Sequence, residues 1–588
     1  MKGIPMDPRP WTRFYAAGTA ADLPPLAQDH IARFARAHAV IHAGRPAFST
    51  VLPGGQSGTL SYAKLDRASD YFAAYLRETL KLQPGDRVAI QLPNCLAYPV
   101  AALGVFKAGC VLVNTNPLYT AAEMAYQFKD SGARALVVLD LFTDRLALGL
   151  AGTRVEHVVL ASLTEGFSPV TGAVVRFVLK HIQHKVPPCP VDFTPFRGAL
   201  RVGRAHVNHL GPPALKAYID GQGAATLAAL QYTGGTTGVS KGAMLSHGNL
   251  LSNVEQAYAF CCHRIIPEQE LVLAPLPLYH VFAFTVNFLT FYRTGAHSLL
   301  IPSPRPVSNL KAAFDRHDIT WMTGVNTLYA ALLGEKWFTR RPPKKLKVSI
   351  AGGAALLSAV AERWRLALGE TPTEGYGLTE ASPVVCFNPL GQGRVGCIGV
   401  PLPGTDVKLV KEDGSLAAIG EAGELCVKGP QVMQGYWGRP EDSAAVLQDG
   451  WLRTGDVAIM DRDGFLRIVD RLKDVVVVSG FKVFPNEVED VLAKLVGVAQ
   501  AAVVGAPDGD HGEQVVAFIV PAKGAVVTAA SVREHCRQSL TNYKVPKLVV
   551  FKDDLPKTNI GKILRKDLRA EAAAAAQNAH TGPRTRGR

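Results

Sequence analysis

The chain carries the stretch Tyr232-Thr233-Gly234-Gly235-Thr236-Thr237-Gly238-Val239-Ser240-Lys241 directly after the apolar run 227–230. Glycines let backbone N–H groups approach an anion closely, the hydroxyl groups add donors, and the lysine adds a mobile positive charge. A Walker A loop is excluded, because no glycine stands five places before a Gly-Lys-[Ser/Thr]. By itself the stretch slightly favours a phosphate cradle over a flexible surface hairpin.

Strand-like and helix-like segments alternate on both sides of this stretch, which predicts βαβ units and largely parallel sheets. The segments before it are 88–92, 96–106, 111–114, 120–129 and 135–139. Later strand-like runs end in Pro277-Leu278-Tyr279-His280, Gly324-Val325-Asn326-Thr327, Gly352-Gly353 and Tyr376-Gly377-Leu378-Thr379-Glu380. Because α/β sheets bind ligands beyond the carboxyl ends of their strands, we expect these segments to surround one site.

The composition describes a globular protein of two or more domains. The chain has 588 residues, of which 48% are hydrophobic and 19% charged, and a formal charge of +14. That charge suits nucleic acid, an anionic membrane or polyanionic substrates. Nucleic acid is disfavoured, because we find neither basic residues interleaved with exposed aromatics nor a recognised module. Nine cysteines without a C-x-x-C pair, no signal peptide and no bilayer-length apolar run predict a cytoplasmic location.

A smaller α+β module is expected after the charged segment 470–474, a plausible hinge. It is predicted to contain short strands at 475–478, 502–504 and 515–520 and helices at 486–494 and 530–539. The predicted domains are therefore 1–470 and 471–570, followed by an alanine-rich tail, 571–588, that we expect to be disordered.

The segment 174–186 is predicted to be a basic amphipathic helix. Its apolar residues recur at helical spacing opposite Arg176, Lys180, His181, His184 and Lys185. A surface helix packed on its own core is the favoured interpretation. Peripheral attachment to the inner face of an anionic membrane is the alternative. A homodimer is likewise left open.

The motifs resemble, in their order, those of the adenylate-forming superfamily, which contains acyl-CoA synthetases, luciferases and adenylation domains. They are the glycine-rich stretch, Tyr376-Gly377-Leu378-Thr379-Glu380, Thr454-Gly455-Asp456, Asp470-Arg471-Leu472-Lys473 and Pro556-Lys557-Thr558-Asn559-Ile560-Gly561-Lys562. The resemblance is strongest to bacterial long-chain fatty-acid CoA ligases. It implies an α/β fold with stacked βαβ sheets and a small distorted β-barrel in a large N-terminal domain, followed by a smaller mobile α+β domain.

The resemblance implies that a fatty acid attacks ATP to form an acyl-adenylate and pyrophosphate, and that CoA then displaces AMP. A ligase for medium-chain or aryl acids and a fatty-acyl-AMP ligase are the enzymatic alternatives. A nucleotide- or lipid-binding protein on the same fold is the alternative without catalysis. The ATP-binding residues that the resemblance implies are Thr233, Gly234, Gly235, Thr236, Thr237, Gly238, Lys241, Gly353, Ala354, Tyr376, Gly377, Thr379, Asp456 and Arg471.

Chemistry supports several of these roles. Tyr376 would lie against adenine unless it is a core tyrosine, and Asp456 suits the paired ribose hydroxyls unless it only forms a turn. Glu380, with Thr233, would hold Mg²⁺, a hard ion that few carboxylates and the substrate phosphates bind. Lys562, the family's catalytic lysine, would bridge the acid and the α-phosphate, although it also lies in a basic cluster of a kind that is usually solvated.

The remaining roles rest on the resemblance. His280 would gate or position the acid, with a structural histidine as the alternative. Lys473 would be the hinge, and the acid pocket would include Gly324, Val325 and Gly352. Gly480, Phe481 and Lys482 would serve the CoA step.

Overall fold

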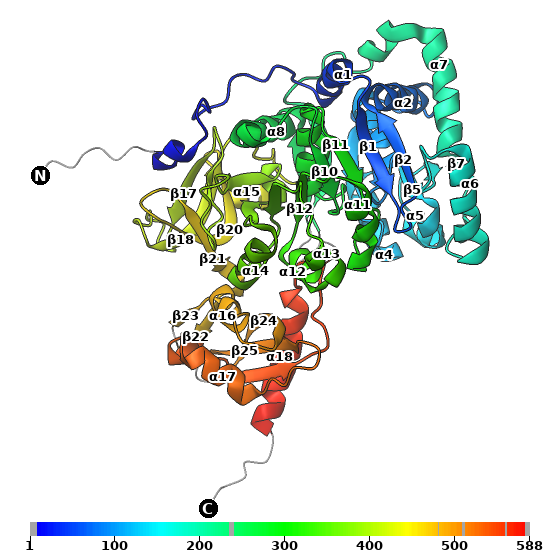
Figure 1. The fold of residues 1–588 in the computed structure, drawn as a ribbon. Coiled ribbons are helices and arrows are strands. Elements are labelled where there is room, and N and C mark those ends of the chain that lie inside the picture. The colour runs from blue at the N-terminus through cyan, green and yellow to red at the C-terminus, as the bar shows by residue number, and fades with distance from the viewer. Residues whose placement is uncertain (1–8, 234–239, 480, 509–511, 559–560, 582–588) are drawn as a thin grey trace, which may run out of the picture.

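The computed structural model describes residues 9–233, 240–479, 481–508, 512–558 and 561–581, and has the α/β class that the alternation predicts (Figure 1). One large sheet has parallel neighbours except for its last strand, which is antiparallel. Its strand order is β7 (Thr194–Pro195), β6 (His157–Ala161), β5 (Ala135–Leu139), β3 (Arg87–Gln91), β4 (Val111–Asn114), β8 (Leu227–Tyr232) and β9 (Gly242–Ser246).

The second large sheet is parallel in its centre and antiparallel at both edges. Its order is β16 (Val400–Pro401), β15 (Val384–Phe387), β14 (Thr373–Gly377), β13 (Val348–Ala351), β12 (Trp321–Gly324), β10 (Leu271–Ala274), β11 (His297–Leu300), β1 (Pro46–Val51) and β2 (Ser57–Ser61). The glycine-rich stretch follows β8, and Gly352-Gly353 follows β13. Thr233, the described start of the stretch, and Gly352-Gly353 therefore lie at carboxyl ends of strands, as expected.

Helices cover the two sheets, and one of them is enclosed. Every residue of α3 (Ala97–Lys107) is buried, and its side chains share one core cluster with β3 and β10. A helix that is apolar all round is stable only in such a place. The other N-terminal helices are α1 (Ile31–Ile41), α2 (Tyr62–Ala74), α4 (Ala121–Ser131), α5 (Leu146–Leu150), α6 (Pro169–Phe177), α7 (Phe196–Ala217), α8 (His247–Cys261), α9 (Val281–Ala283), α10 (Phe291–Arg293), α11 (Lys311–Arg316), α12 (Asn326–Gly334), α13 (Lys336–Arg340), α14 (Ser358–Leu368) and α15 (Pro440–Val446).

The small β unit is a five-stranded antiparallel sheet. Its strands are β17 (Asp406–Val410), β18 (Ala422–Lys428), β19 (Leu447–Gln448), β20 (Trp451–Met460) and β21 (Leu466–Arg471). The C-terminal module, orange to red in Figure 1, lies below the larger body. It contains β22 (Val476–Val478), β23 (Phe481–Val483), α16 (Pro485–Leu492), β24 (Val498–Pro507), β25 (Glu513–Pro521), α17 (Ala529–Arg537), β26 (Leu548–Phe551) and α18 (Arg565–Thr581).

Two segments differ from their predictions. Residues 571–581, expected to be disordered, continue α18, because Leu568, Ala572 and Ala576 are buried against β24 and β25. The helix expected over 174–186 begins earlier, as α6, and continues only as a π-helical turn, Val178–Ile182, before two prolines. The last residues of the expected tail, 582–588, lie outside the described residues.

Candidate functional site

A cavity of about 890 Å³ opens between the carboxyl ends of the large sheets, the five-stranded sheet and the C-terminal module. Its walls include residues of β8, β13, β14, β20 and β21 and the segment before α18. Motifs from both predicted domains therefore meet at one place. The predicted site residues on its walls are Thr233, Lys241, His280, Gly352, Gly353, Tyr376, Gly377, Thr379, Glu380, Asp456, Arg471, Lys473 and Lys562.

One polar group of the cavity consists of Tyr376, Asp456 and Arg471. Asp456 and Arg471 are paired residues on β20 and β21, and their side chains form an ion pair of 3.1 Å. The Tyr376 hydroxyl donates to the other carboxylate oxygen at 2.5 Å. Burial and the Asp456 charge hold the pKa of Tyr376 well above its usual range, so that the phenol stays protonated. This group presents an aromatic ring beside a carboxylate, as an adenosine would require.

Two glycines shape the wall around this group. Gly353 has a φ of +77°, a conformation that side chains disfavour. A Cβ atom on Gly377 would lie 2.1 Å from the carbonyl oxygen of Pro383. Only glycine fits at Gly377 without movement of the backbone. Ala354, also predicted, does not line the cavity.

The two described ends of the glycine-rich stretch, Thr233 and Ser240-Lys241, contact each other. The Thr233 N–H donates to the carbonyl of Lys241 at 2.9 Å, and the Lys241 amine forms a 2.5 Å ion pair with Asp442. Gly234, Gly235, Thr236, Thr237 and Gly238 lie outside the described residues. The structure therefore brings the lysine and one threonine of the predicted phosphate site to the cavity.

Glu380 faces the same part of the cavity. The Tyr436 hydroxyl donates to one of its carboxylate oxygens at 2.7 Å, a contact that the sequence did not suggest. Within the described residues there is no cluster of three or more His, Cys, Asp or Glu side chains suited to a metal. A single carboxylate beside a phosphate site still fits Mg²⁺, which keeps several waters and takes few protein ligands.

Lys562 reaches the cavity from the C-terminal module. A short turn holds it, in which the Thr558 N–H donates to the Lys562 carbonyl at 2.7 Å. Burial first, and then the charge of Arg471, lower the pKa of Lys562 to about 8. Within the described residues the Lys562 amine forms no ion pair, although Asp456 and Asp474 act on it from a distance. Burial of such an ammonium is unfavourable, so this position suits a bound anion.

His280 lines the cavity near this lysine. Its Nδ1 accepts the backbone N–H of Phe282 at 3.3 Å and so caps α9. Burial and the Lys562 charge lower the pKa of His280 to about 4. The imidazole is therefore neutral near pH 7 and has one nitrogen left to face a ligand.

The sequence reasoning missed an apolar part of the cavity wall, which is called the apolar branch below. Its wall consists of Ala257, Phe260, Cys261, Ile265, Val286, Phe291, Trp321, Phe387 and Leu402. Ala257, Phe260 and Cys261 lie in α8, Val286 lies in the π-helical segment Phe284–Thr290, and Phe291 begins α10. Trp321 lies in β12 and Phe387 in β15, while Ile265 and Leu402 lie in loops. No local motif marks them, because an apolar residue beside a cavity has the same sequence pattern as one in a filled core.

Two residues predicted to line the acid pocket are not on its wall. Gly324 lies beneath the ring of Tyr329, where a Cβ atom would come within 2.8 Å of it. Val325 precedes α12 and faces Gly561. Gly352 does line the cavity.

The residues predicted for hinge and CoA contact are separated in this structure. Lys473 lines the cavity, and burial lowers its pKa. Phe481 stacks on Tyr543 at 4.8 Å, and Lys482 forms a 2.5 Å ion pair with Glu412. Neither of the latter two lines the cavity, and Gly480 lies outside the described residues.

Comparisons with known proteins agree with this architecture. Among the similar solved structures are an anthranilate CoA ligase in complex with anthranoyl-AMP (TM-score 0.81, 25% identity, 94% of this chain and 99% of that one) and ATP-bound MatB from Rhodopseudomonas palustris (TM-score 0.75, 28% identity, 97% of this chain and 100% of that one). A long-chain-fatty-acid–CoA ligase of Salmonella typhimurium is 45% identical over 570 residues, covering 97% of this chain and 99% of that protein. One from Bacillus subtilis is 37% identical over 492 residues, 83% and 86% of the two chains.

Family comparison assigns both parts of the chain. Residues 487–562 match the C-terminal domain of AMP-binding enzymes. Residues 31–437, more than half of the chain, match the AMP-binding enzyme family itself. The predicted superfamily is thereby confirmed, and the chain belongs to the AMP-binding enzyme family.

Proposed function

We propose that the protein ligates a long-chain fatty acid to coenzyme A at the expense of ATP, through an acyl-adenylate. The observation that carries this proposal is one cavity whose wall combines charged and polar side chains with a cluster of apolar ones, and that Lys562 and His280 also line. The polar end suits a nucleotide and the apolar branch suits a hydrocarbon chain. The identity to ligases named for long-chain fatty acids supports this substrate class.

In the first step a carboxylate oxygen attacks the α-phosphorus of ATP, the bond to the β-phosphate breaks, and pyrophosphate leaves. Tyr376 would lie against adenine, Asp456 and Arg471 would hold the ribose, and Lys241 would hold the leaving phosphates. The Lys562 ammonium would lie between the two anions and stabilise the charge that builds up in the transition state. His280, neutral at pH 7, would position the acid.

Mg²⁺ is part of the proposal, with Glu380 as its carboxylate ligand and Thr233 beside it. When bound, the ion would neutralise phosphate charge. Glu380 suits this role because Tyr436 orients its carboxylate at the cavity wall.

In the second step the CoA sulfur attacks the acyl carbonyl, the bond to the phosphate oxygen breaks, and AMP leaves. We propose that the chain divides near Asp470, that Lys473 is the hinge, and that a rotation brings the Phe481 and Lys482 side to the cavity. In the present arrangement Lys562 lines the cavity and Phe481 and Lys482 do not. The rotation would exchange them.

Activity on an acid series tests the proposal. Acetate, octanoate, palmitate, oleate and benzoate are incubated with ATP and CoA, and AMP and thioester are both quantified. Palmitate and oleate should give the highest kcat/KM, with equal AMP and thioester. Adenylate without thioester would instead indicate a fatty-acyl-AMP ligase, preference for benzoate or octanoate an aryl or medium-chain ligase, and no AMP a binding protein.

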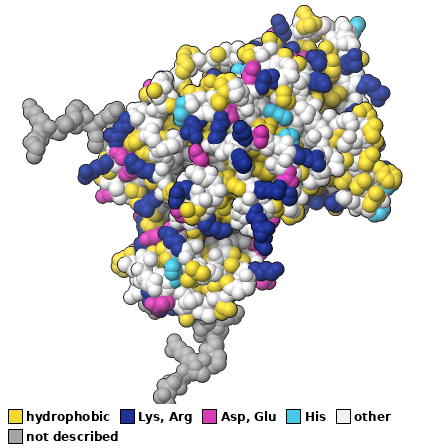
Figure 2. Space-filling model, viewed as in Figure 1, with side chains coloured by type: hydrophobic (Ala, Val, Ile, Leu, Met, Phe, Trp, Pro, Cys, Tyr) yellow, Lys and Arg dark blue, Asp and Glu magenta, His cyan; other side chains and the backbone are white. Residues whose placement is uncertain are grey.

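We further propose that the α6 surface contacts an anionic membrane, from which the fatty acid is taken. Val170, Val174, Phe177 and Ile182 are each more than half exposed. Figure 2 shows hydrophobic side chains gathered at the edge where Figure 1 has α6. Only Gly172 of α6 is buried, while Val175 and Leu179 of the segment pack against the core.

Charge favours the same partner. Asp192 is the one acidic residue between Glu165 and Asp220, whereas this segment has seven Lys or Arg residues: Arg176, Lys180, Lys185, Arg197, Arg201, Arg204 and Lys216. Exposed apolar side chains flanked by basic ones suit the interface of an anionic bilayer. No helix in the described part of the chain has the length and apolar content to cross a bilayer.

Flotation with vesicles tests the membrane contact. Val174→Asp with Phe177→Asp should abolish flotation with phosphatidylglycerol vesicles and leave the turnover of water-soluble octanoate unchanged. Leu366→Asp, at a leucine of α14 that is 71% exposed, is the control and should float like wild type. Equal flotation of both variants, or equal binding to neutral vesicles, would contradict the proposal.

A further inference from the structure

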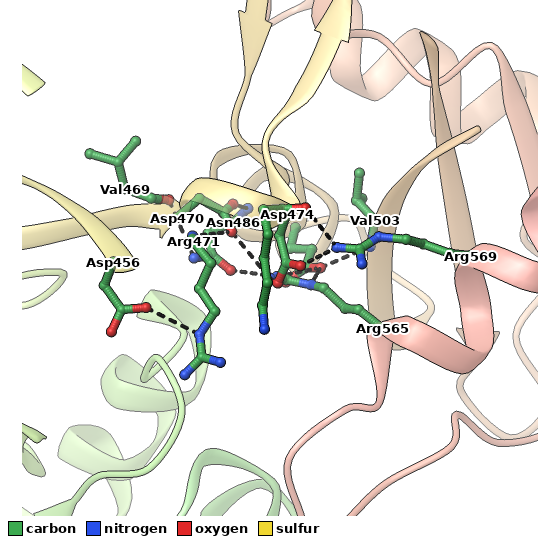
Figure 3. A network of polar contacts seen from close by, with 11 residues as sticks. Asp456, Val469, Asp470, Arg471, Asp474, Asn486, Val503, Arg565 and Arg569 are labelled. Carbon is green, nitrogen blue, oxygen red and sulfur yellow. Dashed lines mark hydrogen bonds and ion pairs between the residues drawn. The ribbon is translucent and has the colours of Figure 1, made fainter. Parts of the chain in front are cut away.

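The place of Lys562 depends on the arginine that begins the next helix. Arg565 starts α18, three residues after Lys562, and its side chain is only 17% exposed. Its guanidinium lies 2.8 Å from Glu489, 2.5 Å from the Asn486 side chain and 3.2 Å from Asp470. Figure 3 shows Arg565 beside Asn486 and Asp470. Asp474 lies 3.5 Å away. A buried arginine with this many acceptors has little freedom to move, and neither has the segment that carries Lys562.

These acceptors belong to different bodies. Glu489 and Asn486 are on α16 of the C-terminal module, and Asp474 follows the proposed hinge residue Lys473. Asp470 precedes that residue and lies in β21, which pairs with β20 of the five-stranded sheet. Among the Arg565 partners in the described chain, Asp470 is therefore the one anchored in the N-terminal body.

Strand geometry explains how Asp470 reaches across. Successive side chains of a strand point to opposite faces. Arg471 points into the cavity and pairs with Asp456, whereas Asp470 points toward Asn486 and Arg565, as Figure 3 shows. At the end of β21, Asp470 thus contacts the C-terminal module, and the next residue, Arg471, lines the cavity.

Asp470 makes several charge-assisted contacts and is fully buried. One oxygen accepts the backbone N–H of Asn486 in the first turn of α16 at 2.9 Å. The other accepts from Arg565 and from the backbone N–H of Arg471 at 2.9 Å. Burial raises the pKa of Asp470 while Arg565 opposes that rise. A carboxylate at a helix N-terminus and beside a guanidinium stabilises this arrangement of the two bodies.

We propose that Asp470 is a positioning residue for acyl-adenylate formation, which holds the C-terminal module, through Arg565 and α16, where Lys562 reaches the cavity. Asp470 itself does not line the cavity. The inference rests on the proposed function, because it assumes that Lys562 acts in the adenylate-forming step. It goes beyond that function in assigning the control of this step to a residue outside the cavity.

The experiment compares the two half-reactions in Asp470→Asn, in the full-length protein. Acyl-adenylate formation is followed as palmitate-dependent exchange of pyrophosphate into ATP without CoA, and thioester formation is followed from supplied palmitoyl-AMP and CoA. Loss of the charge should slow exchange by about tenfold, the size expected for one hydrogen bond to a charged group. Thioester formation should stay within about twofold of wild type, because Lys562 is not needed at the cavity for that step.

Glu489→Gln is the matched control. It removes one carboxylate from the same arginine, but both residues lie in the C-terminal module. Its ratio of exchange to thioester formation should equal that of wild type, whatever its melting temperature. Tryptic cleavage after Lys473 gives a second readout, and should be faster in Asp470→Asn than in Glu489→Gln.

The outcomes separate the two proposals. Exchange and thioester formation that fall equally in Asp470→Asn, or a ratio that shifts as much in Glu489→Gln, would overturn the positioning role. If Asp470→Asn is recovered in too little folded form to assay, Asp470→Ser replaces it under the same criteria. Wild-type protein without palmitate-dependent exchange would instead overturn the proposed function.

Discussion

The two ends of the cavity are built from different kinds of sequence. The polar end takes its residues from short motifs with unusual composition, such as Tyr376 to Glu380 and the segment ending in Lys562. The apolar branch takes Phe260, Phe291 and Trp321 from a helix, a helical turn and a strand without any motif. Charged and glycine-rich groups must be placed individually, whereas a hydrocarbon wall needs only shape and apolar character.

This difference separates chemistry from selectivity. Substitutions at the polar end should change the rate for every acid, because every acid reacts through its carboxylate and with the same nucleotide. Substitutions in the apolar branch should change the ranking of acids and leave the chemistry intact. The following expectations, from the largest effect to the smallest, test that division.

Removal of the Lys562 amine should have the largest effect. We expect Lys562→Ala to slow palmitate-dependent pyrophosphate exchange by at least ~10²-fold, the size expected for loss of one preorganised charge. Thioester formation from supplied palmitoyl-AMP should largely survive. If Lys562→Ala exchanges pyrophosphate as fast as wild type, Lys562 does not take part in adenylate formation.

Removal of the Asp456 carboxylate should weaken nucleotide binding. Asp456→Ala leaves Arg471 and the Tyr376 hydroxyl without their shared partner. We expect KM for ATP to rise roughly 10- to 100-fold, as for lost hydrogen bonds to a charged group. Tyr376→Phe keeps the ring and the carboxylate, so it should cost less. The KM for palmitate should change little, and a parallel rise in both constants would contradict separate ends.

The pH dependence of the first step should report the charge of Lys562. Its pKa is lowered from 10.5 to about 8, and the ammonium form is the one proposed to act. Exchange measured without CoA, so that no thiol titrates, should therefore fall above pH 8 by up to about tenfold per unit. Bound ATP would shift this limb upward, so subsaturating ATP gives the cleanest profile. Octanoate and palmitate should give the same limb.

The same loss of the Lys562 proton that should lower activity above pH 8 should raise the stability of the fold. Between pH 8 and 10.5 the unfolded chain retains a proton that folded Lys562 has lost, so its contribution makes the free energy of unfolding rise with pH in that window. Below pH 8 both states are protonated and the burial penalty is complete. Chemical unfolding of wild type and Lys562→Ala across this range should show that the free energy of unfolding of wild type rises relative to that of the variant as the pH increases, because the other titrating groups are common to both proteins.

Filling the apolar branch should have the smallest effect on chemistry. Ala257 lines it from α8, and Ala257→Phe would occupy space that the end of a long acid needs. We expect kcat/KM to fall by about tenfold for palmitate, equivalent to roughly two methylene groups. Octanoate should be affected by less than about twofold. An equal loss for both acids would mean that the branch does not hold the chain.

The sequence predicted the sheets and the small module well, because periodicity and turn residues are local. The helices expected at 486–494 and 530–539 are α16 and α17, shifted by one or two residues at their ends. It failed for the alanine-rich tail, whose helix is held by tertiary burial of Leu568, Ala572 and Ala576. It also failed to mark α7, whose pattern includes internal glycines and two prolines.

The motifs by themselves determined the family and the order of its two domains, and they predicted polar residues that line one cavity, because glycines at tight turns and charges at strand ends are dictated by local geometry. Tertiary structure decided that those residues line the same cavity. Only the folded chain brings Tyr376, Asp456 and Lys562 to one cavity, adds an apolar branch from Phe260 to Trp321, and turns Asp470 away from it. Side chains distant in sequence meet through packing of sheets and modules, which no local pattern encodes.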